Sequence, residues 1–145
     1  MGWTGIDPAQ WASRAKRLDV ALLRNSVQEL AKEASKTIPN GGRVPVLTGN
    51  LGRSVVISAT PPMMDKAGTI RTTAQNFSLG VAELEPGKPV YIGWQAVYAR
   101  RQNYGFVGAD SLGRVYNQAG HGFAEAAAEQ WPTIVIREAS KLANK

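Results

Sequence analysis

The stretch DPAQWASRAKRLDVALLRNSVQELAKEASKTI, residues 7–38, decides the fold because it holds the longest periodic pattern in the chain. Asp7 can cap a helix, Pro8 suits the first helical position, and Gln10 completes a capping box. The run PNGG, residues 39–42, then breaks the pattern. We therefore predict one long amphipathic helix. Its apolar positions form two runs, the second one residue out of step with the first: Trp11, Ala15, Leu18 and Leu22, then Leu23, Val27, Leu30, Ala34 and Ile38.

The elements that follow this helix are short. The β-branched residues 55–59 predict a strand, and residues 63–76 a turn with a ragged strand. Two further strands are predicted over residues 77–83 and 89–94, while residues 96–101 fit either a strand end or a helical turn. We expect a small antiparallel sheet of three to four strands.

The C-terminal part combines a glycine-rich segment with a second helix. Residues 104–122 lack sustained periodicity and are interpreted as a loop or an extended assembly arm. Residues 123–144 follow a helical pattern, and Pro132 inside it predicts a kink or two abutting helices near Trp131. Trp11 and Trp131 lie on the apolar faces of their helices and are expected in the core. The whole chain, residues 1–145, is predicted to be one α+β domain.

The stretch VLTGNLGRS, Val46–Ser54, could be a phosphate cradle or part of the architecture. A phosphate-binding loop needs four residues between its glycines and a lysine before the hydroxyl. Here only two residues separate Gly49 from Gly52, and Arg53 stands in place of the lysine. We therefore predict an architectural turn. Its four key residues are Thr48 as a cap, Gly49 to relieve the backbone, Leu51 in the core and Ser54 before the strand.

Composition and charge limit the classes of function. The 145 residues carry 17 basic and 11 acidic side chains, a net charge of +6 that is common in nucleic-acid-binding proteins. The basic residues are spread along the chain, however, with only short pairs such as Lys16-Arg17 and Arg100-Arg101. No run approaches the roughly 18 apolar residues of a membrane span. The start of the chain does not resemble a secretory signal, so we expect synthesis in a cytoplasm and no membrane partner.

The sequence offers little for catalysis or metal binding. It has no cysteine, and its one histidine, His121, stands between two glycines. The acid pairs Glu83 with Glu85 and Glu125 with Glu129 have no evident nucleophile or third ligand nearby. We therefore expect no enzyme activity and no cofactor. A small hydrolase that uses His121 is the weakest of the functional hypotheses.

A series of motifs, in a fixed order, resembles the tail-completion or neck proteins of siphophages, the family that includes minor tail protein Z of lambda-like phages. The resemblance spans nearly the whole chain. Asn103-Tyr104-Gly105-Phe106 marks one departure, since many relatives have an acidic residue before this glycine, often followed by Thr. The motifs are carried by Thr48, Gly49, Leu51 and Ser54, by Ile92-Gly93, by Tyr98-Ala99 and Tyr104-Gly105, and by Phe123 with Ala126 and Ala127.

This resemblance implies a structural virion protein, made in the cytoplasm of a bacterial host. Such proteins form a ring at the head-tail joint, expected here as a homo-hexamer that contacts neighbouring neck and tail-tube or terminator proteins. DNA passes through the ring and could touch it non-specifically. The alternative from another class is a small basic nucleic-acid-binding protein that uses the N-terminal helix and Arg100-Arg101.

The glycine-rich segment is the expected interface. It holds more apolar side chains than a plain linker, and arginines lie within it and just before it. We expect the apolar groups to fill pockets on a neighbour while the arginines meet carboxylates at the rim. The candidate interface residues are Arg100, Arg101, Phe106, Val107, Leu112, Arg114, Val115 and Tyr116.

Overall fold

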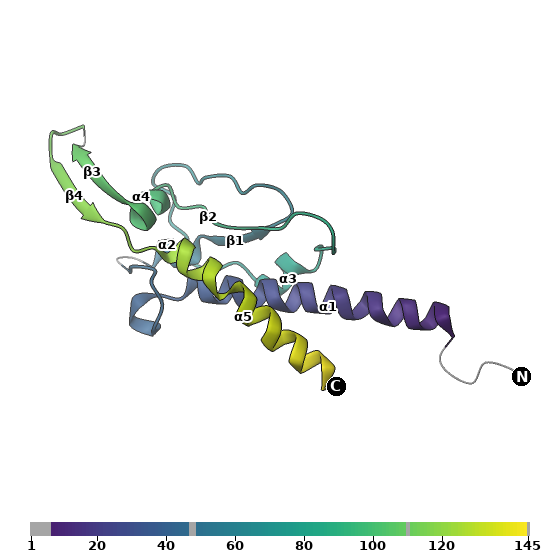
Figure 1. Ribbon diagram of the computed structural model, residues 1–145. Helices are drawn as coiled ribbons and strands as arrows, with labels where there is room; N and C mark the ends of the chain where they lie inside the picture. The colour runs from purple at the N-terminus through teal and green to yellow at the C-terminus, as the bar shows by residue number, and fades with distance from the viewer. Residues whose placement is uncertain (1–6, 47–48, 110, 145) are drawn as a thin grey trace, which may run out of the picture.

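A long N-terminal helix runs through the molecule and the other elements collect on one half of it (Figure 1). The computed structural model describes residues 7–46, 49–109 and 111–144. The chain is α+β, as predicted. In order, the elements are α1 (Pro8–Ser35), η1 (Ile38–Asn40), α2 (Asn50–Arg53), β1 (Val55–Ser58), α3 (Phe77–Val81), β2 (Tyr91–Trp94), α4 (Ala99–Tyr104), β3 (Gly105–Ala109), β4 (Val115–Ala119) and α5 (Phe123–Ala143).

Helix α1 forms as the sequence predicts, but only its C-terminal half is buried. The Asp7 side chain accepts a hydrogen bond from the Ala9 backbone N–H, and Pro8 occupies the first turn. Val27, Ala31 and Ala34 are buried against the body, whereas the first half of the helix extends beyond it (Figure 1). Trp11 is 64% exposed, so the expectation that it lies in the core is wrong.

The strands form two separate two-stranded sheets instead of the one sheet of three to four strands that we expected. Strand β1 pairs antiparallel with β2, with Val55 opposite Trp94 and Ser58 opposite Tyr91. Strand β3 pairs antiparallel with β4, so residues 104–122 contain a β-hairpin and not a loop. The register of this hairpin places Gly105 opposite Ala119.

Residues 77–83 were predicted as a strand but begin with helix α3. The Asn76 side chain accepts hydrogen bonds from the Ser78 and Leu79 backbone N–H groups, and this cap starts the helix. Within residues 63–76 the structure contains no strand, so the ragged strand expected there is also wrong. Residues 96–101 resolve into a turn followed by the start of α4.

Helix α5 packs along the C-terminal half of α1 (Figure 1). Pro132 lies inside one continuous helix, so of the two expected alternatives the abutting helices are wrong and the kink stays a prediction. Phe123 and Ile134 are buried, and Trp131 packs at the edge of the core as expected. A larger core cluster joins α1, β1, α3 and α5, and a smaller one gathers around Val44, Leu51 and Phe123.

Candidate functional site

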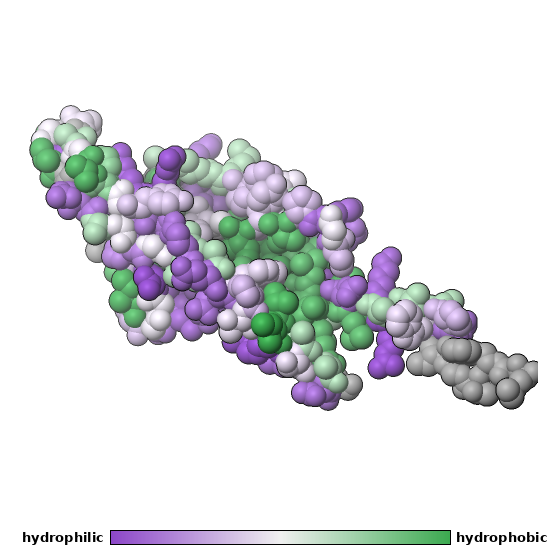
Figure 2. Space-filling view, viewed as in Figure 1, coloured by the Kyte–Doolittle hydropathy of each residue, from purple (hydrophilic) through white to green (hydrophobic). Residues whose placement is uncertain are grey.

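The hairpin β3–β4 projects from the body at the end opposite the first turns of α1 (Figures 1 and 2). Val107, Leu112 and Val115 on this hairpin are 75–81% exposed, although all three are large apolar side chains. A two-stranded hairpin is at best marginally stable in water without further packing. The segment predicted as a loop or an arm is therefore a two-stranded ribbon with an uncovered apolar surface.

The arginines expected at the rim lie near the foot of the hairpin. Arg100 and Arg101 are exposed on α4, and the Arg101 guanidinium carbon lies 4.0 Å from the centre of the Phe106 ring, a cation–π contact. Arg114 is exposed near the start of β4. Tyr116 lies in β4, but its side chain is outside the described part of the structure.

Two glycines allow the hairpin to close at its base. Gly105 has φ +88°, and a Cβ atom on it would lie 2.5 Å from the Gln118 carbonyl oxygen. Gly120 is held equally tightly, against the backbone of Asn103 and Tyr104. This close approach gives the Tyr104-Gly105 motif a structural reason, while the Tyr104 side chain itself is largely exposed.

Asn103 connects the hairpin base to helix α5. Gly122, the residue before α5, has no side chain that could cap the helix. The Asn103 amide oxygen instead accepts a hydrogen bond from the Ala124 N–H at 2.8 Å, and its amide nitrogen donates to Glu125 at 3.1 Å. The Asn103 carbonyl also accepts from the Gly122 N–H at 3.0 Å. The Asn103 side chain, which belongs to α4, therefore caps the start of α5.

Residues 49–54 hold the short helix α2 and the start of the link to β1, which fits the architectural turn predicted from the glycine spacing. Gly49 precedes α2 with φ +81°, a left-handed conformation that favours glycine. Leu51 is 3% exposed, and the buried Ser54 hydroxyl donates to the Leu51 carbonyl at 2.7 Å before β1 begins. Thr48, the predicted cap, lies outside the described residues.

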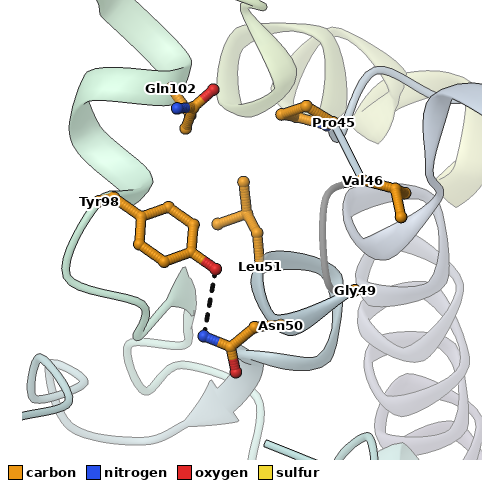
Figure 3. Close-up of a pocket in the computed structure, with 7 residues that line it drawn as sticks. All are labelled: Pro45, Val46, Gly49, Asn50, Leu51, Tyr98 and Gln102. Carbon is orange, nitrogen blue, oxygen red and sulfur yellow. Dashed lines mark hydrogen bonds between the residues drawn. The ribbon is translucent and has the colours of Figure 1, made fainter. Parts of the chain in front are cut away.

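An open apolar pocket of about 330 Å³ lies between α2 and α4 (Figure 3). Tyr98 and Gln102 lie on one side of it and Pro45 and Val46 on the other, with Leu51 between them. The Tyr98 hydroxyl accepts a hydrogen bond from the Asn50 amide at 3.1 Å. The pocket thus sits beside the foot of the hairpin, since α4 leads directly into β3.

A polar network behind this pocket fixes the long segment between β1 and α3. Arg71 donates two hydrogen bonds to the Asp65 carboxylate, at 2.7 and 2.8 Å, and one to the Gln95 amide oxygen at 2.8 Å. The Arg71 backbone N–H donates to the Asn50 side chain at 2.7 Å. The hydrogen bonds between Asp65 and Arg71 lower the pKa of Asp65 and raise that of Arg71. The network therefore holds the segment between β1 and α3 in place.

The remaining motif and aromatic residues serve the core more than a surface. Phe123 is buried with its ring 4.8 Å from Trp94, and Ala99 is buried beside them. The Trp94 ring N–H donates to the Ala34 carbonyl at 3.2 Å. Trp94, Tyr98 and Tyr104 therefore form no single surface: Trp94 packs at the core, Tyr98 lines the pocket and Tyr104 is exposed to solvent.

His121 lies between β4 and α5, where its backbone N–H donates to the Gln102 carbonyl at 2.8 Å. Within residues 7–46, 49–109 and 111–144, no group of three or more acidic, histidine or cysteine side chains is arranged to hold a metal. None of the helices described is long and apolar enough to cross a membrane.

Sequence reasoning did not single out Asn50, Asp65 and Arg71, and it noted Asn103 only as a departure from the resembled family. Their partners lie far away in sequence, as with Asn50 and Tyr98, so no local pattern connects them. One signal was present for Asn103: the second helix begins after a glycine, so its first backbone N–H groups need a cap from elsewhere.

Comparison of the chain with protein-family models, with curated proteins and with solved structures gave no match.

Proposed function

We propose that this protein is a structural component of a tailed phage or prophage particle, a ring subunit at the joint between head and tail. The observation that carries the proposal is the β3–β4 hairpin, a paired element that holds its apolar side chains away from the subunit's own core. Exposed apolar surface of this kind is typical of an interface that is buried in an assembly. The order of sequence motifs points to the same class of protein.

The composition of the hairpin fits an interface between protein subunits. Val107, Leu112 and Val115 supply apolar contact area, and Arg100 and Arg101 flank the foot of the ribbon. Interfaces bury apolar groups at their centre and keep charged groups at the rim. In a ring, the hairpin would lie against a neighbouring subunit or against the adjoining neck or tail ring.

Hydrogen exchange tests this proposal directly. In the isolated subunit, the amides of β3 and β4 should exchange fast, since few contacts other than their mutual pairing protect them. In assembled particles the same amides should be protected, while those of the buried half of α1 should change little. Equal exchange of the hairpin in both states, or absence of the protein from purified particles, would contradict the proposal.

A second candidate is a nucleic-acid-binding protein. Arg14 and Arg17 line one shallow site on the projecting half of α1, and none of the described ion pairs involves either residue. Binding to duplex DNA that weakens steeply with salt would support this candidate. The genes beside this one separate the two, because capsid, portal and major tail genes are expected only for the virion protein.

A further inference from the structure

The two apolar runs of α1 point in different directions. Each residue advances a helix by about 100°, so a one-residue shift turns the apolar face by roughly that angle. The second run, with Val27 and Ala34, faces the body and is buried. The first run, with Trp11 and Leu18, faces elsewhere, and both side chains are exposed. The subunit's own core therefore cannot cover the first run. Even if the body extended further along α1, it would lie against the side of the helix that the second run occupies.

A positive charge lies beside this exposed run. Arg14 is three residues after Trp11 and four before Leu18, so the three side chains are neighbours on the helix surface. Arg14 is exposed and takes part in none of the described ion pairs. A partner for this face should combine an apolar contact with a carboxylate.

Such a combination is present beside α3. Leu79 is 72% exposed, and Glu83, four residues later, is exposed and likewise outside the described ion pairs. The neighbouring carboxylate Glu85, by contrast, is already paired with Lys88 at 2.9 Å. Leu79 and Glu83 both line an open groove of about 380 Å³ between α3 and the end of β1. An apolar side chain and an unpaired negative charge thus border one groove.

The same subunit cannot bring these two faces together. Helix α3 is held against the middle of α1, where Gln28 donates to the Ser78 hydroxyl at 3.2 Å and Arg24 to the Leu84 carbonyl at 3.3 Å. Arg14 is ten residues before Arg24, about 15 Å along the helix axis. The projecting half of α1 also leads away from the body (Figures 1 and 2). Only another molecule can supply the complementary face.

We infer that the projecting half of α1 docks on the α3 groove of a second copy, with Trp11 and Leu18 against Leu79 and with Arg14 beside Glu83. The two faces differ, so repeating this contact from subunit to subunit either closes a ring or extends a filament. The inference deepens the proposed function by naming a contact between neighbouring ring subunits. It rests on that function only in taking the partner to be a second copy.

A charge swap tests the contact in the purified full-length chain. Sedimentation velocity and native mass spectrometry would follow self-association of the original protein, Arg14→Glu, Glu83→Arg and the double variant. Each single variant places like charges together and should weaken association about tenfold or more, while the double variant restores the pair and most of the affinity. Trp11→Ala should also weaken association.

Lys66→Glu is the matched control, because it makes the same charge change at an exposed position outside both faces. It should leave association unchanged, and circular dichroism should show that every variant is folded. The inference is overturned if the original chain stays monomeric, if the single variants associate normally, or if the double variant gains nothing over them. Loss of DNA or anionic-vesicle binding in Arg14→Glu, with self-association unchanged, would also overturn it.

These outcomes are separable from those that test the proposed function. Rings that persist in all the variants would remove this contact and leave a role at the head-tail joint standing. Conversely, the charge swap could succeed for a protein that is absent from particles. In that case the contact holds and the virion role fails.

Discussion

At the scale of single residues, a few polar side chains hold the irregular parts of the chain in place. Asn103 caps α5 from α4, and Asn50 joins α2 to the segment that carries Arg71. Each of these amides satisfies backbone groups that no secondary structure would satisfy. The sequence alone did not reveal these roles, because an asparagine in a short helix has the same local sequence signature whether or not a distant backbone group bonds to it.

Ser26 is the exception among the buried polar side chains. It lies inside α1, and its hydroxyl makes no hydrogen bond within the described chain. Ser26→Ala should therefore leave the free energy of unfolding unchanged or raise it by up to about 1 kcal/mol, since it removes an unsatisfied group and favours the helix. Urea denaturation measures this. Ser13→Ala, on the exposed part of the same helix, reports the gain from helix propensity alone, and a clear loss for Ser26→Ala would contradict the expectation.

Asp65 should make stability depend on pH. Its hydrogen bonds to Arg71 lower its pKa in the folded protein, so this contribution is present above the unfolded pKa of about 3.9 and is lost as the pH falls through the lower folded value. Asp65→Asn should cost about 1 to 3 kcal/mol at pH 7, and the difference from the original protein should shrink below about pH 4.

Denaturation at a series of pH values would follow that difference. Asp19→Asn is a suitable control, because Asp19 is exposed on α1 and takes part in none of the described ion pairs. This variant should change the free energy of unfolding little at pH 7. An Asp65→Asn effect that is equally large at pH 7 and pH 3 would argue against the ion pair as its cause.

At the scale of elements, the sequence predicted those that have a long period or a β-branched run. Helices α1 and α5 and strands β1 and β2 were expected at nearly their observed positions. Helix α3 was not, because residues 77–83 contain an apolar pattern that also fits a strand, and the Asn76 cap decided the outcome. The β3–β4 hairpin was missed because glycines at 105, 108, 113 and 120 hide the alternation that marks a strand.

Helix α2 is short and depends on one buried side chain. Leu51 is almost fully buried in the smaller core cluster beside Ala96 and Phe123. Leu51→Ala should lower the free energy of unfolding by about 2 to 4 kcal/mol. Leu112→Ala removes the same atoms from a residue that is 75% exposed and should change the unfolding free energy little. Similar urea midpoints for the two variants would show that Leu51 is not essential to the packing.

At the scale of the whole molecule, the subunit consists of a body with two projections, the hairpin and the first half of α1 (Figure 1). Hydrophobic side chains on both are exposed in the single chain. The sequence predicted residues 104–122 as a loop or an assembly arm, and it placed Trp11 in the core. The reason is that periodicity shows which side of a helix is apolar but does not show whether anything lies against that side.

Deletion of residues 107–119 should spare the body and abolish assembly. The hairpin's main contacts are between its own strands and with α4, so the circular dichroism of α1 and α5 and their unfolding transition should be preserved. Electron microscopy of particles that carry the deletion should then show separated heads and tails. A chain that no longer folds would instead make the hairpin part of the core, and normally joined particles would remove its role as the arm.

The base of the hairpin also determines how the subunit would bear load. The ribbon leaves the body at Gly105 and returns at Gly120, and these residues are pressed together beside Asn103. A force on the tip of the hairpin therefore reaches the body at one point, the close contact between Gly105 and Gly120. The hydrogen bonds that Gln102 and Asn103 accept from His121, Gly122 and Ala124 lie beside that point, so tension would reach the start of α5 before the packing between α1 and α5.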